Sequence, residues 1–193
     1  MNDQKAAAAP RIIAFVGMPG AGKSLCAAHM SASGYFQFRF GGIVVDEVLR
    51  RGLPLTPENE RMIREEFRAN EGMDAIARRA LPILQAGLAE HNTLVIDGLY
   101  SFSEYKTLKR DLSDDLTVIA IVCARATRYA RLAARPERPL TRAEAEQRDI
   151  SEIENIEKGG PIAIADFTLL NDESPDELIA SLDAVLARLG IVR

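Results

Sequence analysis

The chain has 193 residues, enough for one domain with a substantial core. Its composition, 47% hydrophobic and 27% charged, is typical of a globular protein and excludes a disordered or collagen-like chain. Twenty-four basic against 28 acidic residues give a net charge of −4, which argues against a general nucleic-acid-binding surface. No apolar run reaches the ~20 residues of a membrane helix. The two cysteines are too few for a disulfide framework, so we expect a cytoplasmic protein without membrane contact.

Strands and helices are predicted to alternate along the chain. We expect residues 1–10 to form a flexible lead-in and residues 11–193 to form one domain. Apolar runs predict strands at 12–16, 35–40, 93–96, 116–123 and 167–170. Helical spacing predicts helices at 22–33, 41–51, 57–69, 73–88, 103–112, 125–133, 141–158 and 175–189, with an N-cap at Thr56 and a kink at Pro82. Because most strand runs lack alternation, this order predicts a three-layer α/β fold with a parallel sheet.

Residues 17–24 read GMPGAGKS, which fits the phosphate-loop pattern G-x-x-x-x-G-K-[ST] between a strand and a helix. The glycines let the backbone amides approach a phosphate closely, Lys23 would reach the β- and γ-phosphates, and Ser24 would bind Mg²⁺. The alternative is a glycine-rich turn that binds nothing. We predict an ATP site formed by Gly17, Pro19, Gly20, Ala21, Gly22, Lys23, Ser24 and Leu25.

A single carboxylate, Asp97, directly follows the buried strand 93–96. It is therefore expected at the carboxyl edge of the sheet, where open α/β sheets bind their ligands. There it would hold Mg²⁺ through water or act as a general base. The alternative is an aspartate that only caps a helix or turn.

Arginines are concentrated between residues 125 and 148, where seven arginines face three glutamates. The sequence RPERP at 135–139 interrupts the helical pattern, as a hinged lid would. Phosphoryl transfer needs cations around the migrating group, and for this role we favour Arg131, Arg135 and Arg148. Arg125, Arg138 and Arg142 fit a solvated charged helix at least as well.

Several stretches resemble the nucleoside-monophosphate-kinase branch of P-loop proteins. They are GMPGAGKS at 17–24, RRGLPLTPEN at 50–59, NEGMDAIARR at 70–79, VIDGLYS at 95–101 and EKGGPIAIADFTLLND at 157–172. The chain is most similar to an adenylate-kinase-related family and more distantly to dephospho-CoA kinases. The resemblance implies a five-stranded sheet of order 2-3-1-4-5, a substrate-binding helical region at 41–90 and a lid at 131–148. It also implies that Arg131, Arg135 and Arg148 contact the transferring phosphates and that the loop from Asn171 lies against the adenine ring.

The chain departs from these relatives at the acceptor site. Monophosphate kinases place an aspartate after the second strand, an arginine one turn later and another arginine after the third strand. Here the first two positions are Gly42 and Val45. The segment after the third strand, Asp97-Gly98-Leu99-Tyr100, contains no arginine. Asp46 is an alternative base or an exposed helix residue. The lost positive charges have three possible replacements, Arg39, Arg64 and Arg68.

These features favour an ATP- and Mg²⁺-dependent small-molecule kinase, a monomer or homodimer, that transfers the γ-phosphoryl group to a nucleotide-like or hydroxyl acceptor. Nucleosides, nucleotides and dephospho-CoA-like molecules all qualify. An acceptor without a terminal phosphate is slightly favoured, because neither Val45 nor Tyr100 supplies a cation. The alternative is a nucleotide-dependent switch or regulatory ATPase without a small acceptor.

Overall fold

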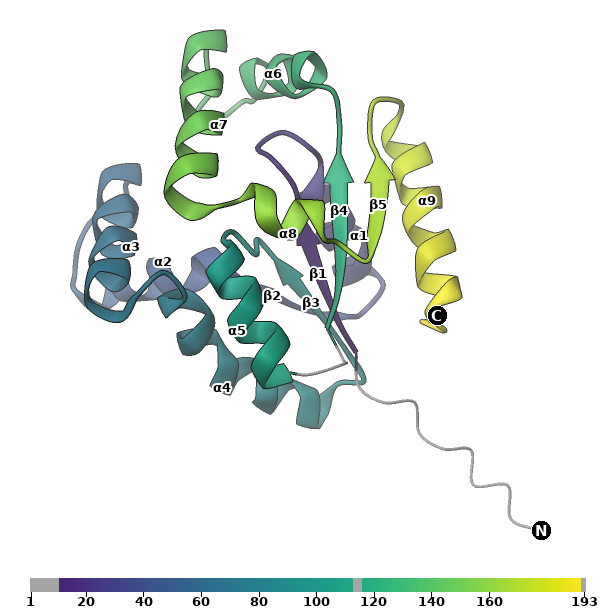
Figure 1. Cartoon of the computed structure of the whole chain (residues 1–193), viewed down its shortest axis with the longest axis horizontal. Helices are drawn as coiled ribbons and strands as arrows, with labels where there is room; N and C mark the ends of the chain where they lie inside the picture. Colours follow the sequence, from purple (N-terminus) through teal and green to yellow (C-terminus); the bar gives the residue numbers. More distant parts are fainter. Residues whose placement is uncertain (1–10, 113–115, 192–193) are drawn as a thin grey trace.

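A five-stranded parallel sheet forms the centre of the protein. The computed structural model describes residues 11–112 and 116–191 (Figure 1), so the predicted lead-in 1–10 lies outside the described residues. The strands are β1 (Arg11–Val16), β2 (Phe36–Arg39), β3 (Thr93–Asp97), β4 (Leu116–Val122) and β5 (Phe167–Leu170). Their order is β2-β3-β1-β4-β5, and every neighbouring pair is parallel. This confirms the predicted topology.

Helices connect the strands and follow the predicted ranges to within a few residues. They are α1 (Lys23–Ala32), α2 (Phe40–Arg50), α3 (Pro57–Glu71), α4 (Ala75–Glu90), α5 (Phe102–Leu112), α6 (Arg125–Ala133), α7 (Arg142–Ile156), α8 (Gly159–Ala163) and α9 (Pro175–Arg188). Thr56 caps α3 as predicted, and Pro82 lies inside α4. The predicted helix 141–158 is too long, because Glu157 adopts a left-handed conformation (φ 53°) that ends α7. The short helix α8 was not predicted.

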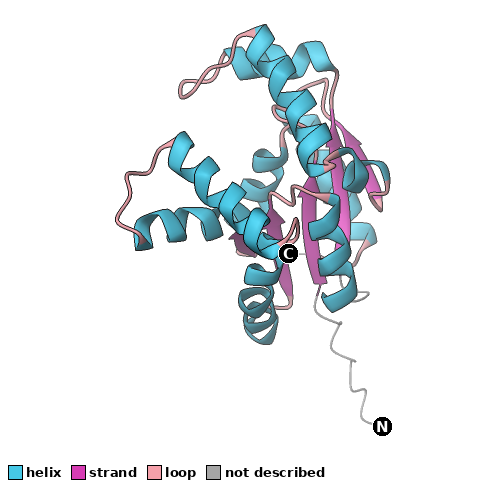
Figure 2. Ribbon diagram, turned by 60° about the vertical axis from the view of Figure 1, so that its left-hand side comes forward, coloured by secondary structure: helices cyan, strands magenta, loops and turns pink. Residues whose placement is uncertain are grey.

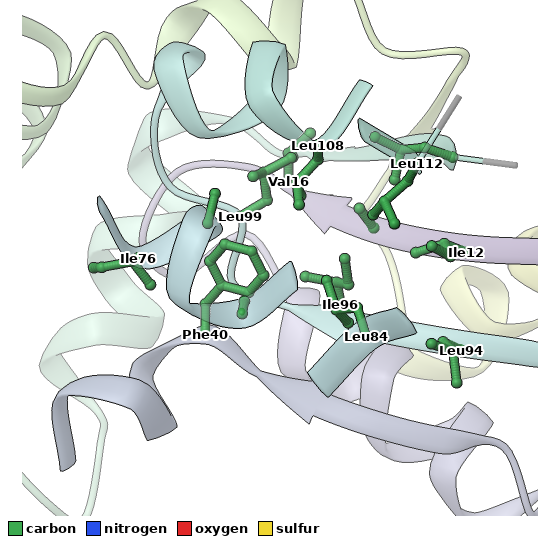
Figure 3. Close-up of a cluster of buried hydrophobic side chains, with 14 of the residues drawn as sticks. Ile12, Val16, Phe40, Ile76, Leu84, Leu94, Ile96, Leu99, Leu108 and Leu112 are labelled. Atoms are coloured by element: carbon green, nitrogen blue, oxygen red, sulfur yellow. The ribbon is translucent and has the colours of Figure 1, made fainter. Parts of the chain in front are cut away.

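The sheet has a hydrophobic core on each face. Side chains that alternate along β1 point to opposite faces, so Ile13 and Phe15 pack toward α1 and α9. Ile12 and Val16 pack toward α2, α4 and α5 on the other face, together with Leu84 and Leu108 (Figure 3). Figure 1 shows α9 on one side of the sheet and α4 and α5 on the other. The predicted three-layer α/β architecture is therefore confirmed.

Two helical hairpins project from this core (Figure 2). One consists of α2 and α3. The other consists of α6 and α7, beyond the carboxyl end of β4 in Figure 1, and has a small core of its own formed by Tyr129, Leu132 and Ala145. The loop at 134–141 separates α6 from α7, as the RPERP sequence predicted. None of the described helices is long and apolar enough to cross a membrane.

Candidate functional site

The phosphate loop joins β1 to α1, and its backbone geometry requires glycine. Gly22 begins α1 in a left-handed conformation (φ 110°), and a Cβ atom there would lie 2.3 Å from the side-chain nitrogen of Asn171. At Gly17 (φ 150°) a Cβ atom would lie 2.4 Å from the carbonyl oxygen of Ile121. Lys23 Nζ donates hydrogen bonds to the carbonyl oxygens of Gly17 (2.8 Å) and Met18 (3.2 Å). The lysine thus lies across the loop as the sequence motif requires.

Buried side chains brace the loop from outside the cavity. Asn171 donates to the carbonyl oxygen of Ala21 at 2.7 Å, and Arg128 donates to that of Pro19 at 3.0 Å. Both guanidinium nitrogens Nη1 and Nη2 of Arg128 also bind the carboxylate of Asp149, at 3.0 and 2.6 Å. Sequence reasoning assigned no role to Arg128, because a periodic run of arginines does not reveal which one is buried. Asn171 itself does not line the cavity, so its side chain supports the loop and the contact with adenine stays a prediction.

A cavity of about 370 Å³ lies in front of the loop. Ten predicted site residues lie along it: Pro19, Gly20, Gly22, Lys23, Ser24, Leu25, Asp97, Arg131, Arg135 and Arg148. The predicted residues Gly17 and Ala21 do not line it and contribute backbone only. Six cationic side chains and one carboxylate surround this cavity, which we call the phosphate cavity. Such an excess of positive charge favours a polyanionic ligand.

Asp97 ends β3, with Phe15 of β1 opposite it on one side and Arg39 of β2 on the other. This register places its carboxylate beside the phosphate loop. Asp97 and the hydroxyl of Ser24 line the same cavity, and oxygen donors of this kind suit Mg²⁺ held jointly with nucleotide phosphates. Among the described residues there is no group of three or more histidine, cysteine or acidic side chains that could hold a metal ion. Ser24 and Asp97 therefore fit a metal ion that the nucleotide phosphates help to hold.

Lys158 is a second lysine of the phosphate cavity that sequence reasoning missed. It is 2% exposed, its ammonium group pairs with Glu152, and its Nζ lies 5.1 Å from the ring centroid of Tyr100. Burial lowers the pKa of Lys23 to about 7, and the positive charge of Lys158 is the second cause. The only sequence signal for Lys158 was its place in the stretch 157–172. No spacing rule predicted that its side chain lines the phosphate cavity.

A larger cavity of about 950 Å³ lies between the two helical hairpins and includes side chains of α2, α3 and α7. We call it the acceptor cavity. It shares Arg39, Gly41, Tyr100 and Arg148 with the phosphate cavity. Its wall also contains Gly42, Val45, Arg64 and Arg68.

The remaining candidate residues lie outside the phosphate cavity. Asp46 is exposed and lines neither cavity, so the structure gives it no role as a base. Arg125 forms an exposed ion pair with Glu146, and Arg142 is exposed, as expected of a solvated helix. Arg138 instead reaches the acceptor cavity.

The strand order, the phosphate loop and the two adjoining cavities define a P-loop domain with a kinase-like fold. Residues 13–158 match the family model described as AAA domain. The chain is 37% identical to a UPF0200 protein of Methanothrix thermoacetophila over 93% of this chain and 98% of that one. It is 32% identical to a UPF0200 protein of Thermococcus kodakarensis over 92% and 100%. The chain therefore belongs to the UPF0200 family, and its P-loop domain belongs to the AAA-domain family.

One relative is longer. A UPF0200/UPF0201 protein of Archaeoglobus fulgidus is 35% identical over 93% of this chain, which spans 56% of that protein.

Solved structures with the same fold include kinases. A Thermus thermophilus protein aligns with TM-score 0.66 and 22% identity over 94% of this chain and 98% of that one. Shikimate kinase of Bacteroides thetaiotaomicron aligns with TM-score 0.59 and 14% identity over 93% and 98%. A gluconokinase of Sinorhizobium meliloti aligns with TM-score 0.57 and 19% identity over 93% of each chain. At these identities the likeness establishes the fold alone, and this fold is the one that the sequence resemblance implied.

Proposed function

We propose that the protein is a cytoplasmic, ATP- and Mg²⁺-dependent kinase for a small molecule. The observation that carries the proposal is the junction of the two cavities. The phosphate cavity, with Lys23 and Asp97, adjoins the acceptor cavity through the side chains of Arg39, Tyr100 and Arg148. A volume of about 950 Å³ is large enough for a small-molecule acceptor.

In this reaction the bond between the γ-phosphorus and the bridging oxygen of ATP breaks, ADP leaves, and a phosphorus–oxygen bond to the acceptor forms. The backbone amides of residues 17–24 and the ammonium group of Lys23 bind the phosphates. Ser24 and Asp97 are the residues that would hold Mg²⁺, which when bound neutralises charge on the nucleotide. The alternative role of Asp97 is to accept the proton when the acceptor is a hydroxyl group. The cations Arg131, Arg135, Arg148 and Lys158 stabilise the charge on the migrating group.

A nucleotide-dependent switch or regulatory ATPase is the second candidate. It is favoured by Val45 and Tyr100, which stand where related kinases hold an acceptor phosphate with arginines. A switch releases ADP at the same rate with or without a small acceptor. A kinase releases ADP faster when its acceptor is present.

The test measures ADP release with a panel of nucleosides, nucleotides, dephospho-CoA and sugars, using the wild type, Lys23→Ala and Asp97→Asn. We expect one acceptor class to accelerate ADP release. Lys23→Ala should abolish the thermal stabilisation by Mg·ATP, because only a ligand bound to the native state raises its stability.

Asp97→Asn should lower turnover at least about 100-fold while ATP affinity changes little. Asp46→Asn, a matched aspartate outside both cavities, should behave as the wild type. No thermal shift of the wild type at millimolar Mg·ATP would refute nucleotide binding. Equal losses of turnover and affinity in Asp97→Asn would make Asp97 a structural residue.

A further inference from the structure

The acceptor cavity contains more positive charge than its own carboxylates neutralise. Six arginines and three glutamates line it. Arg148 pairs with Glu152 at 3.0 Å, and Arg138 approaches Glu60 at 3.9 Å. Within the described part of the chain, Arg64 has no ion pair. The surplus of positive charge thus includes side chains of α3, the helix that forms one wall of the cavity.

Arg68 is the most unusual of these side chains. It is only 13% exposed, and its nearest carboxylate oxygen, Oε1 of Glu104, lies 3.8 Å away. Within the described residues, Arg68 Nε, Arg68 Nη2 and Glu104 Oε1 are buried without a hydrogen-bond partner. A buried donor without an acceptor costs about 1–3 kcal/mol, and more when it is charged. An arginine that lines a cavity and has unpaired N–H groups provides hydrogen-bond donors for a ligand.

Hydrogen bonds to the backbone at the start of α5 hold the Glu104 side chain away from Arg68. Its Oε2 accepts hydrogen bonds from the backbone amides of Tyr100 (2.9 Å) and Ser101 (3.0 Å), which fixes the start of α5. A rotation toward Arg68 would break both bonds. Glu104 therefore offsets part of the charge of Arg68 without satisfying its N–H groups.

Arg64 and Arg68 are four residues apart on α3, so they lie on the same face of that helix. Two positive charges in this arrangement repel each other. Burial lowers the pKa of Arg68, the charge of Glu104 opposes this shift, and the charge of Arg64 lowers the pKa further. An anion between the two guanidinium groups would remove the repulsion and supply the missing acceptors, because guanidinium groups bind phosphate and carboxylate in bidentate fashion.

We infer that Arg64 and Arg68 bind an anionic group, phosphate or carboxylate, of the molecule that occupies the acceptor cavity. The inference rests on the proposed function, since it names the class of acceptor. It also revises the sequence-based preference, because α3 replaces the cations that Val45 and Tyr100 cannot supply. An acceptor that presents a hydroxyl group still fits if it carries an anion elsewhere. An uncharged nucleoside or sugar does not fit.

The test uses inorganic phosphate and acetate as probes of the acceptor cavity. The phosphate loop is first saturated with a non-hydrolysable ATP analogue and Mg²⁺, and each anion is then titrated calorimetrically. The wild type should bind at least one of the two anions, and the stronger one identifies the anionic group. Arg64→Gln and Arg68→Gln should each weaken that binding at least tenfold. Arg110→Gln, an exposed arginine paired with Asp111, should leave it unchanged.

Two results would overturn the inference. One is a wild type that binds neither anion, and the other is binding that survives in both α3 variants. Arg64 is half-buried, so Arg64→Gln is expected to fold and decides the matter even if Arg68→Gln is unstable. Repeating the titration on Lys23→Ala without nucleotide separates this inference from the proposed function. In that background, the part of the anion binding that Arg64→Gln and Arg68→Gln remove belongs to the acceptor cavity, whereas a failure of the ATP analogue to bind the wild type counts against the proposed function only.

Discussion

The phosphate cavity and the acceptor cavity adjoin each other but are built in different ways. Backbone geometry forms the first, since the glycines, the carbonyl oxygens bound by Lys23 and the brace from Asn171 fix the loop. Long side chains of separate helices form the second, and Arg64, Arg68 and Glu152 are among its charged residues. A site made of backbone depends on a short sequence motif. A site made of side chains depends on how helices distant in sequence are packed.

The largest expected loss of stability comes from breaking the contact between the phosphate loop and the α6–α7 hairpin. Arg128→Met removes the partner of Asp149, which is 10% exposed and would remain buried with its charge. Breaking a buried pair in this way costs about 3–5 kcal/mol. Arg125→Met, which breaks an exposed pair with Glu146 on the same two helices, should cost less than about 1 kcal/mol. Urea denaturation of both variants checks the difference. Equal losses would mean that Arg128 does not anchor the loop.

A smaller effect is expected at the loop itself. Gly22→Ala places a methyl group against Asn171 and forces a side chain into a left-handed conformation. Strain of about 1–3 kcal/mol and a weakened bond from Asn171 to Ala21 should lower the melting temperature and ATP affinity together. Gly34→Ala is the control, since Gly34 also has positive φ (89°) but open space around its Cβ position. It should lower stability modestly and leave ATP affinity unchanged. An unaffected Gly22→Ala protein would contradict the described loop geometry.

The same contrast explains which features the sequence could predict. The five strands follow from buried apolar runs, their order was implied by the resemblance to P-loop kinases, and the phosphate loop follows from one motif. The end of α7 depends on one residue, Glu157, whose left-handed conformation no periodicity indicates. Lys158 directly follows that turn. Because the turn was not predicted, the position of Lys158 in the phosphate cavity was missed. The burial of Arg128 and Arg68 was missed too, since burial of a charged side chain depends on partners distant in sequence.

Lys158 lines the phosphate cavity and contacts Tyr100 and Glu152, which line the acceptor cavity, so it tests whether the two cavities act together. Lys158→Met keeps much of the side-chain volume but removes the charge beside Tyr100 and Glu152. If Lys158 stabilises the migrating phosphoryl group, turnover should fall about 10- to 100-fold, or about 1.4–2.7 kcal/mol, with little change in ATP affinity. Lys158→Arg should restore part of the turnover, because it restores the charge. A purely structural lysine would give the opposite pattern, with lost stability and unchanged turnover in the folded fraction.

The smallest effect is a pH dependence confined to the phosphate cavity. The pKa of Lys23 is lowered to about 7, mainly by burial, from an ordinary value of 10.5. Above pH 7 the free protein therefore holds Lys23 largely neutral, whereas bound phosphates favour the ammonium form. Nucleotide binding must then take up a proton, so affinity should fall by up to about tenfold for each pH unit above 7. Calorimetry at pH 8 in two buffers of different ionisation enthalpy measures that proton directly. Lys23→Arg, which stays charged, should bind without proton uptake, and an affinity of the wild type that is constant from pH 7 to 9 would contradict the lowered pKa.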